Sequence, residues 1–185
     1  LQSRGLGDVY KRQLYDTEFA LELSRSLIMA KMHNQRVVLK RYEASKNQDC
    51  DAEKKIIAVS CEKAKDAEDG PSLLGYEGTA ARAYFQGMGK CVDEAFYFEK
   101  RSRRPPLDPF NSMLSFGYSM LLREIQVSLE THGLNSYFGF FHRDAEKSPS
   151  LACDLIEEWR AVIVDATVMS AVNTVSYTHL RAHET

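Results

Sequence analysis

Apolar residues recur along most of the chain at the spacing of an α-helix rather than that of a strand. The first run begins where Asp16 or Thr17 can cap a helix, and its apolar positions continue from Phe19 to Leu39 at close to a 3.6-residue period. Alternation of apolar and polar residues, which marks a half-buried strand, is scarce throughout the sequence. The pattern therefore predicts an all-α fold.

A second helix is predicted over residues 51–67, and we expect Ile56, Ile57 and Val59 to lie on its buried side. The Gly-Pro pair at positions 70–71 is expected to end it, because glycine and proline together interrupt regular structure. No internal repeat and no low-complexity tract accompany these helices. The chain therefore has the pattern of an ordinary helical domain.

The third helix is predicted to begin at Ser72 and to close at Gly87 and Gly89. Residues 91–109 are rich in arginine and proline and lack helical periodicity, so they are predicted to form a loop. This loop is the longest interruption expected within the helical pattern.

Two further helices complete the predicted fold. Asn111 is expected to cap the fourth, which ends at Gly133 in the C-terminal cap position. Ser148 and Pro149 begin the fifth, with proline in the first turn, where its missing N–H costs little, and the apolar pattern continues to Val168.

Composition limits the class of protein. With 185 residues, 44% hydrophobic and 27% charged, the chain can bury a sizeable core as one domain. The formal net charge of −2 gives no overall attraction to nucleic acid, so any DNA-binding surface must be local.

Cysteine and hydropathy patterns indicate a cytoplasmic protein. The four cysteines (Cys50, Cys61, Cys91 and Cys153) are far apart and form no close ligand pair, so we expect reduced thiols rather than a zinc site. No apolar run approaches the ~20 residues that span a bilayer, and no stretch resembles a secretory signal. We therefore expect no membrane association.

Both ends of the sequence differ from what lies between them. Residues 1–13 and 176–185 continue no amphipathic pattern and resemble stretches of translated adapter sequence. We expect both to be non-native tails, although ordinary frayed termini would also fit. The predicted domain covers residues 14–175, and the natural protein is then expected to extend beyond it.

A histidine and a group of carboxylates stand close together near the fifth helix. Asp154 and Glu157 are three residues apart and share one helix face, shortly after His142. Glu158 is rotated by about 100° from Glu157 and is expected to face solvent. Oxygen ligands with one imidazole suit Mn²⁺ or Mg²⁺, but a solvated helix face fits the same pattern.

Glu77 adds a second carboxylate with an unusual environment. It lies among small and apolar residues of the third helix, where burying a carboxylate is costly unless a cation meets it. Arg82 is one possible partner in a simple ion pair. A metal ion is the other.

Four motifs, taken together, resemble the C-terminal helical domain of Cas1, the integrase of CRISPR adaptation. They read YEGTAARAYF, RSRRPPLDPFNSMLSFGYSMLLREI, GLNSYFGFFHRD and PSLACDLIEEWRAVIVD, and they occur in the family's order. The similarity covers about residues 17–174 and is greatest to the variants of type I-C systems. The family's N-terminal β-domain, which helps to build its dimer, is missing from this sequence.

The resemblance implies a catalytic, metal-dependent site. Glu77, His142 and Glu157 match the family's Mg²⁺ or Mn²⁺ ligands, and Asp154 matches an acidic position beside them that supports the site. The implied reaction is the insertion of spacer DNA at a CRISPR repeat, in which a 3′-OH attacks a phosphodiester. The implied partners are duplex DNA with single-stranded 3′ ends, CRISPR repeat DNA, Cas2 and a second copy of the chain.

Basic residues in the predicted loop are candidates for DNA contacts. Clustered arginines suit phosphates, and the aromatic residues just before them could stack on a base. The DNA-binding candidates are Arg82, Lys100, Arg101, Arg103, Arg104 and Arg143. A solvated charged loop is the plainer alternative. The corresponding alternative for the whole chain is a helical nucleic-acid-binding or interaction module without catalysis, in which the metal ligands never meet.

Overall fold

A computed structural model describes residues 17–142 and 148–183, with the side chains of the last helix described as far as Thr174. Every regular element in these two stretches is helical, which confirms the predicted all-α fold. The elements are α2 (Thr17–Lys46), α3 (Asp51–Lys65), α4 (Gly70–Cys91), η1 (Glu94–Phe96), α5 (Pro109–Thr131), α6 (Ser150–Trp159), η2 (Arg160–Asp165) and α7 (Ala166–His183).

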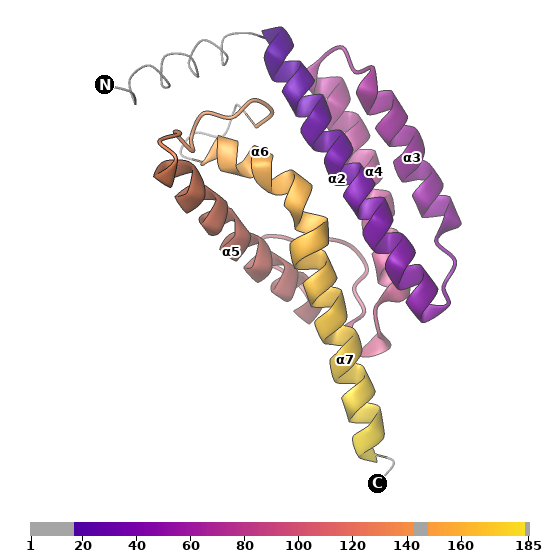
Figure 1. The fold of residues 1–185 in the computed structure, drawn as a ribbon. Coiled ribbons are helices and arrows are strands. Elements are labelled where there is room, and N and C mark those ends of the chain that lie inside the picture. Colours follow the sequence, from indigo (N-terminus) through magenta and orange to yellow (C-terminus); the bar gives the residue numbers. More distant parts are fainter. Residues whose placement is uncertain (1–16, 143–147, 184–185) are drawn as a thin grey trace.

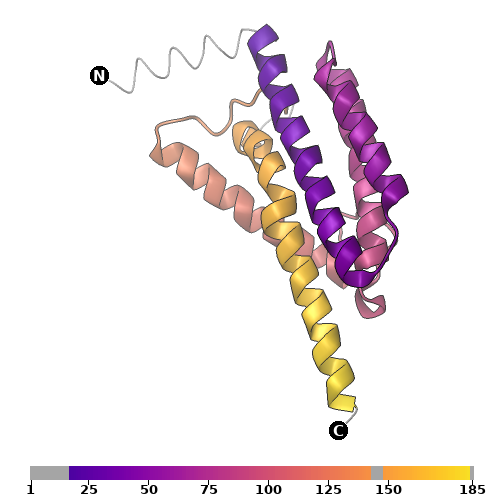
Figure 2. The same cartoon turned by 45° about the vertical axis from the view of Figure 1, so that its right-hand side comes forward.

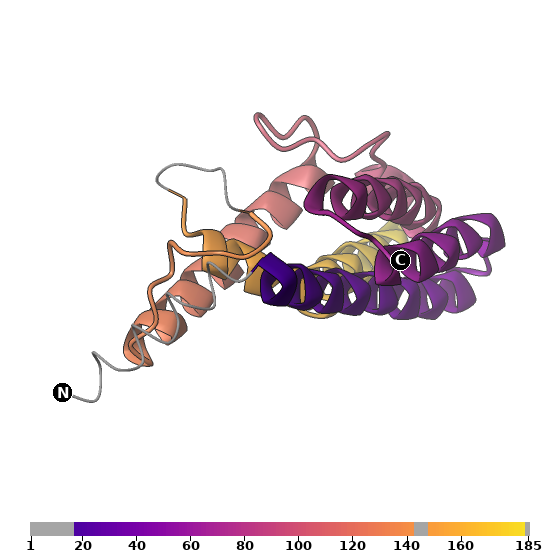
Figure 3. The ribbon, with the colours of Figure 1, turned by 90° about the horizontal axis from the view of Figure 1, so that it is seen from above.

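Two groups of helices build the molecule. Helices α2, α3 and α4 pack side by side, and α6, η2 and α7 form one continuous run that crosses α2 and lies between it and α5 (Figures 1 and 2). The η2 segment is a single π-helical insertion in this run. Figure 3 shows the connection between α4 and α5 at the edge of the molecule far from α2.

The core lies where the two groups meet. Its largest fully buried side chains come from α2, α3, α4, α5 and the α6–α7 run, and they include Ile28, Ile57, Tyr84, Phe110 and Met169. Helix α2 supplies a buried stripe at i, i+3 and i+4 spacing, as an amphipathic helix should. Two polar side chains of that stripe, Lys31 and Gln35, are also buried.

Several predicted helix ends are wrong in detail. Asp108 rather than Asn111 caps α5, accepting the Asn111 backbone N–H at 2.7 Å, and Asn111 itself is fully buried. Its side chain instead binds the preceding loop, donating to the Lys100 carbonyl at 2.9 Å. Asp69 caps α4, with Pro71 in its first turn. The predicted end at Gly133 is confirmed by its positive φ of 75°.

The glycines expected to close the third helix lie inside α4, which continues to Cys91. A Cβ at Gly87 would approach the Leu39 Cδ2 atom to 2.8 Å, so glycine here allows α2 and α4 to pack closely. In α3 the expectation that Ile57 is buried is confirmed. The same expectation is wrong for Ile56 and Val59, which are 42% and 52% exposed. No helix among the described residues is long and apolar enough to cross a membrane.

Candidate functional site

Glu77 and Glu157 meet at a buried lysine. Lys31 of α2 donates a hydrogen bond to Glu77 Oε1 of α4, and its Nζ lies 2.6 Å from Glu157 Oε2 of α6. The side chains of Lys31, Glu77 and Glu157 are only 7%, 16% and 4% exposed. The cation that compensates Glu77 is therefore Lys31, whereas Arg82, the ion-pair partner considered from sequence, is exposed on the same helix.

Glu157 is surrounded by positive charge. Its Oε1 pairs with Arg160 Nη1 at 2.6 Å, while its buried Oε2 accepts no hydrogen bond of good geometry despite the nearby ammonium of Lys31. Burial alone would raise the pKa of this carboxyl, but Lys31 and Arg160 outweigh burial and hold the pKa below its usual value. The carboxylate is thus charged, and each of its oxygens lies beside a cation of the protein.

Asp154 fixes the position of His142. Its Oδ2 accepts the backbone N–H groups of Phe140 and Phe141 at 2.6 and 3.0 Å, and its Oδ1 accepts the backbone N–H of His142 at 3.0 Å. The His142 Nδ1 lies 2.7 Å from the same Oδ1. A carboxylate bound to one ring nitrogen leaves the other, Nε2, as the nitrogen for a ligand.

Gly139 allows this contact. A Cβ at Gly139 would lie 2.7 Å from Asp154 Oδ2 and 2.7 Å from the Ser150 carbonyl carbon. Only glycine lets residues 139–142 run so close to the start of α6.

The two residues that follow Glu157 on α6 are less buried than Glu157 itself. Glu158 is half-buried, and Trp159 is exposed.

The structure brings the three proposed ligands only partly together. Glu77 and Glu157 converge on Lys31, but within the described ranges the group whose ligand atoms all lie within 4.8 Å of one another is Glu43, Asp49 and Asp51. That exposed group is already compensated by Lys54, whose Nζ lies 2.5 Å from Glu43 and 2.8 Å from Asp51. The two carboxylates around Lys31 are the more buried of these two acidic groups.

A cleft of about 750 Å³ leads to the His142 side of the site. It runs between the first turns of α2 and α4 and is lined by Ser24, Leu74, Phe140, Phe141 and His142, among others. Leu74 is one turn before Glu77, so the cleft gives access to the neighbourhood of the carboxylates.

Four of the predicted DNA-binding residues gather at one hollow. Arg82 of α4 and Lys100, Arg101 and Arg103 of the α4–α5 connection line a cavity of about 500 Å³. Arg104 is exposed but does not line this cavity, and Arg143 lies outside the described residues.

Arg101 is largely committed to the protein itself. Its guanidinium donates to Asn111 Oδ1 at 2.8 Å and to Ser115 Oγ at 3.0 Å, and it lies 5.4 Å from the centre of the Tyr118 ring. Burial lowers the pKa of this guanidinium below its usual value. Among the four, Arg82, Lys100 and Arg103 are exposed.

A third buried carboxylate, after Asp154 and Glu157, lies further along the same run. Asp165 accepts the hydroxyl of Tyr118 on Oδ1 at 2.5 Å and that of Tyr84 on Oδ2 at 2.9 Å. Burial raises its pKa to about 6. Arg160 contacts the groups around both Glu157 and Asp165. It pairs with Glu157, and it lies 5.1 Å from the centre of the ring of Tyr118, whose hydroxyl donates to Asp165.

Sequence reasoning missed Lys31 and the Asp165 group. Lys31 does carry a signal, because it falls on the apolar stripe of the first helix between Ile28 and Met32. Asp165 follows three apolar residues at the predicted buried face, but nothing in the sequence pairs it with Tyr84 and Tyr118.

Comparison with known proteins identifies the family. The family model for CRISPR associated protein Cas1 matches residues 6–183. The chain belongs to the Cas1 family. A CRISPR-associated endonuclease Cas1 of Mycobacterium tuberculosis (strain H37Rv) is 40% identical over 157 residues, which are 85% of this chain and 46% of that protein. A Cas1 of Chlorobaculum tepidum is 40% identical over 159 residues, which are 82% of this chain and 46% of that protein.

Solved Cas1 structures share the fold. A Cas1 protein of Thermotoga maritima superposes with a TM-score of 0.73 at 28% identity, over 86% of this chain and 50% of its own. A casposase bound to integration product gives a TM-score of 0.78 at 30% identity, over 90% of this chain and 46% of its own. The predicted resemblance to the C-terminal region of Cas1 is confirmed, and the chain spans about half the length of the curated relatives that it matches.

Proposed function

We propose that this chain is the catalytic helical region of a metal-dependent DNA integrase and endonuclease of CRISPR adaptation. The observation that carries the proposal is the convergence of Glu77 and Glu157, from separate helices, on one buried cation. Both carboxylates lie within ion-pair distance of one ammonium, so their oxygens are close together, and a cluster of carboxylate oxygens is the donor chemistry that a divalent ion requires. The names of the relatives include endonuclease, and one solved neighbour carries an integration product.

The residues present fit Mg²⁺ or Mn²⁺. Glu77 and Glu157 would supply hard oxygen ligands, including the buried Oε2 of Glu157 that accepts no hydrogen bond, and His142 would supply a nitrogen. When bound, the ion would act as a Lewis acid on a phosphoryl oxygen.

The chain's own side chains perform the remaining tasks. Asp154 holds the His142 ring at 2.7 Å and so keeps its orientation relative to α6. Arg82, Lys100 and Arg103 hold DNA phosphates at the hollow beside α4. In the proposed reaction the 3′-OH of a spacer strand forms a new phosphodiester at a CRISPR repeat, and the repeat strand leaves with its own 3′-OH.

The proposed partners follow from the same relatives. Solved neighbours include a Cas6-RT-Cas1–Cas2 complex, so we propose Cas2 and a second copy of this chain as partners on the integrating DNA. The proposed DNA substrates are a duplex with single-stranded 3′ ends and the CRISPR repeat. The proposed location is the cytoplasm, where such DNA is found.

One observation favours a second candidate function. Lys31 and Arg160 together balance the charges of Glu77 and Glu157, so the fold does not need a metal ion to tolerate these carboxylates. A chain whose carboxylates are occupied by its own cations would be a helical nucleic-acid-binding module without catalysis.

A nicking assay separates these two functions. Supercoiled plasmid is incubated with Mn²⁺ and the wild-type chain, and then with Glu77→Ala, His142→Ala and Glu157→Ala. We expect each substitution to lower nicking roughly a hundredfold or more, because each removes a proposed ligand. Glu158→Gln, a half-buried neighbour of Glu157 on α6, is the matched control and should keep wild-type activity.

Two results would contradict the proposed catalysis. Nicking that survives all three alanine substitutions would come from a different site or a contaminant. A wild-type chain that binds DNA but does not nick it, with or without Mn²⁺, would establish the binding module instead.

A further inference from the structure

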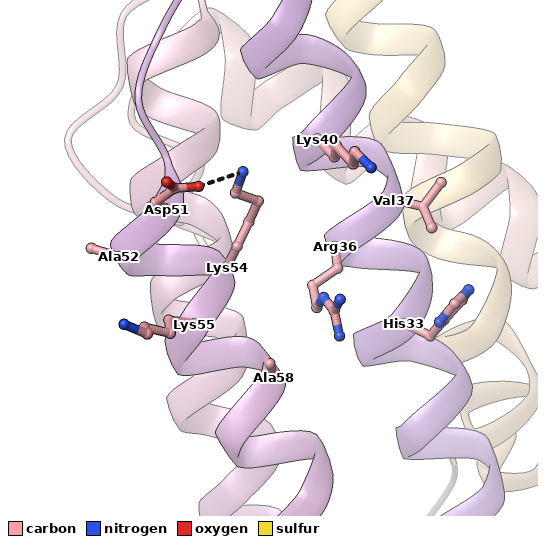
Figure 4. A pocket seen from close by; sticks show the side chains of 9 residues that line it. All are labelled: His33, Arg36, Val37, Lys40, Asp51, Ala52, Lys54, Lys55 and Ala58. Carbon is pink, nitrogen blue, oxygen red and sulfur yellow. Dashed lines mark ion pairs between the residues drawn. The ribbon is translucent and has the colours of Figure 1, made fainter.

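A basic groove lies between the outward faces of α2 and α3, away from the carboxylates. Its volume is about 790 Å³, and Arg36 and Lys40 from α2 and Lys55 from α3 line it together with His33. Figure 4 shows Arg36 extending into the space between the two helices. Neither the proposed catalysis nor the arginine-rich connection uses this face.

The groove carries positive charge that the protein does not neutralise. Lys54 bends toward Asp51, 2.8 Å away, and also pairs with Glu43, so these three side chains satisfy one another (Figure 4). Arg36 and Lys40 make no ion pair within the described part of the chain, and the same is true of Lys55. Because the whole chain has a formal charge of −2, this positive potential is a local feature.

The cations are arranged along the helix axis. His33, Arg36 and Lys40 are spaced at i, i+3 and i+7, so they form one stripe on α2. The stripe spans about 10 Å along the helix axis, which equals the axial rise of about three phosphates of one DNA strand. Lys40 is rotated by about 180° from Lys31, so the groove faces away from the Glu77–Glu157 pair.

Three of the side chains that line the groove are apolar. Ala52 and Ala58 of α3 contribute only methyl groups, and Val37 of α2 is 50% exposed. Small side chains let a backbone approach the two helices closely. These apolar side chains add no hydrogen-bonding group, and the cations beside them attract an anionic ligand.

We propose that this α2–α3 groove binds the phosphodiester backbone of duplex DNA, independently of sequence. The inference rests on the proposed function for its choice of DNA as the anionic ligand. The side chains of Arg36, Lys40 and Lys55 contact phosphate oxygens, and the groove holds a stretch of duplex on the side of α2 opposite the catalytic carboxylates. A chain with both surfaces therefore grips DNA at two separate places.

Duplex binding with charge-removing variants tests the groove. A short fluorescein-labelled blunt duplex without repeat sequence is titrated with the full chain, and anisotropy gives the dissociation constant at several NaCl concentrations. In Arg36→Gln/Lys40→Gln/Lys55→Gln we expect affinity to fall roughly tenfold to a hundredfold, and the slope of log K against log salt to flatten by about 2 to 3.

The matched control removes the same charge elsewhere. Lys46→Gln/Lys63→Gln/Lys65→Gln alters three lysines in the last turns of α2 and α3, outside the groove. It should leave the affinity within about twofold and the salt slope within about one. An equal loss of affinity in both triple variants would show a general charge effect and would overturn the groove.

Failure of the groove and failure of the proposed catalysis give different results. If Glu157→Gln abolishes nicking but the groove variant binds duplex as wild type does, the proposed DNA binding at the groove is contradicted and the proposed catalysis is supported. If Glu157→Gln nicks normally but the groove variant loses duplex affinity, the proposed DNA binding is supported and the proposed catalysis is contradicted. Binding of polyglutamate that the groove variant loses, with unchanged duplex affinity, would assign the groove to an acidic protein and overturn the proposal.

Discussion

Two buried carboxylates on one helical run have opposite surroundings. Glu157, on α6, faces the cations Lys31 and Arg160, and its pKa lies below the usual value. Asp165, at the end of η2, faces the hydroxyls of Tyr84 and Tyr118, and burial raises its pKa to about 6. Burial is similar at the two positions, so the neighbours decide the charge.

This difference distinguishes the candidate binding site around Glu157 from the structural support around Asp165. A carboxylate kept charged among cations can exchange one cation for another, whereas a carboxylate held by neutral donors is a fixed acceptor. Burial raises the pKa of both tyrosine hydroxyls well above their usual value, so they remain donors to Asp165. This contrast agrees with the proposed cation chemistry at Glu157 and with a packing role for Asp165.

The largest expected effect is on catalysis. In the proposed nicking reaction, Glu157→Gln should lower the rate roughly a hundredfold to a thousandfold, because the amide cannot bind a divalent ion as a carboxylate does. Asp165→Asn should keep the rate within about threefold, because it removes a charge outside the proposed ligand set. Initial nicking rates at saturating Mn²⁺ measure both. Equal losses in the two variants would break the distinction between site and support.

Removal of Lys31 tests whether a cation is needed at Glu157. In metal-free buffer Lys31→Met should lower the free energy of unfolding by about 3 kcal/mol, because it leaves two buried carboxylates without their shared ammonium. Mn²⁺ should restore much of this loss in the variant, because no ammonium competes for the carboxylates there. It should stabilise the wild type less, because Lys31 still occupies the same position. Urea unfolding with and without Mn²⁺ measures the difference.

The matched variant for this test lies at the other carboxylate. Tyr84→Phe removes one hydrogen bond to Asp165 and should cost about 1 to 2 kcal/mol, with no recovery on addition of Mn²⁺. A Lys31→Met chain that is as stable as wild type, or that gains no more from Mn²⁺ than Tyr84→Phe does, would show that Lys31 does not compensate the pair.

The sequence predicted the helices well because their buried faces repeat at regular spacing. It failed where tertiary packing decides. Ile56 and Val59 fit an apolar pattern but lie on an exposed face of α3. Gly87 resembles a helix breaker, yet it sits inside α4 because Leu39 of α2 needs the space. Asn111 has the chemistry of a cap, but Asp108 takes that position and Asn111 binds the preceding loop.

The candidate site was partly visible in the sequence. The spacing of Asp154 and Glu157 places both on one face of α6, and the cost of burying Glu77 correctly indicated a nearby cation. That the cation is Lys31, 46 positions away, follows only from how α2 packs on α4. The ligand roles of Glu77, His142 and Glu157, and the supporting role of Asp154, stay predictions.

The pH dependence of stability should distinguish Asp165 from its surroundings. Its folded pKa of about 6 exceeds the unfolded value of 3.8, so its contribution to stability is full below pH 3.8 and is lost as pH rises through 6. From pH 3.5 to pH 7 the unfolding free energy of wild type should therefore fall by about 3 kcal/mol relative to Asp165→Asn. Urea unfolding at a series of pH values measures this difference, and parallel curves for the two proteins would contradict it.

The smallest expected effect concerns the support of His142. Asp154→Asn keeps the size of the side chain but replaces one of its two acceptor oxygens by a donor. In the wild type these oxygens bind backbone N–H groups and the imidazole. We expect Mn²⁺ affinity to fall roughly tenfold to a hundredfold, because the ring loses its orientation. Isothermal titration calorimetry measures the affinity, with Asp108→Asn at the cap of α5 as a control for a lost helix-capping carboxylate. Unchanged Mn²⁺ binding in Asp154→Asn would mean that His142 does not need its carboxylate partner, and the Asp154–His142 contact would then resemble the Asp165 group, a support for the fold rather than part of the site.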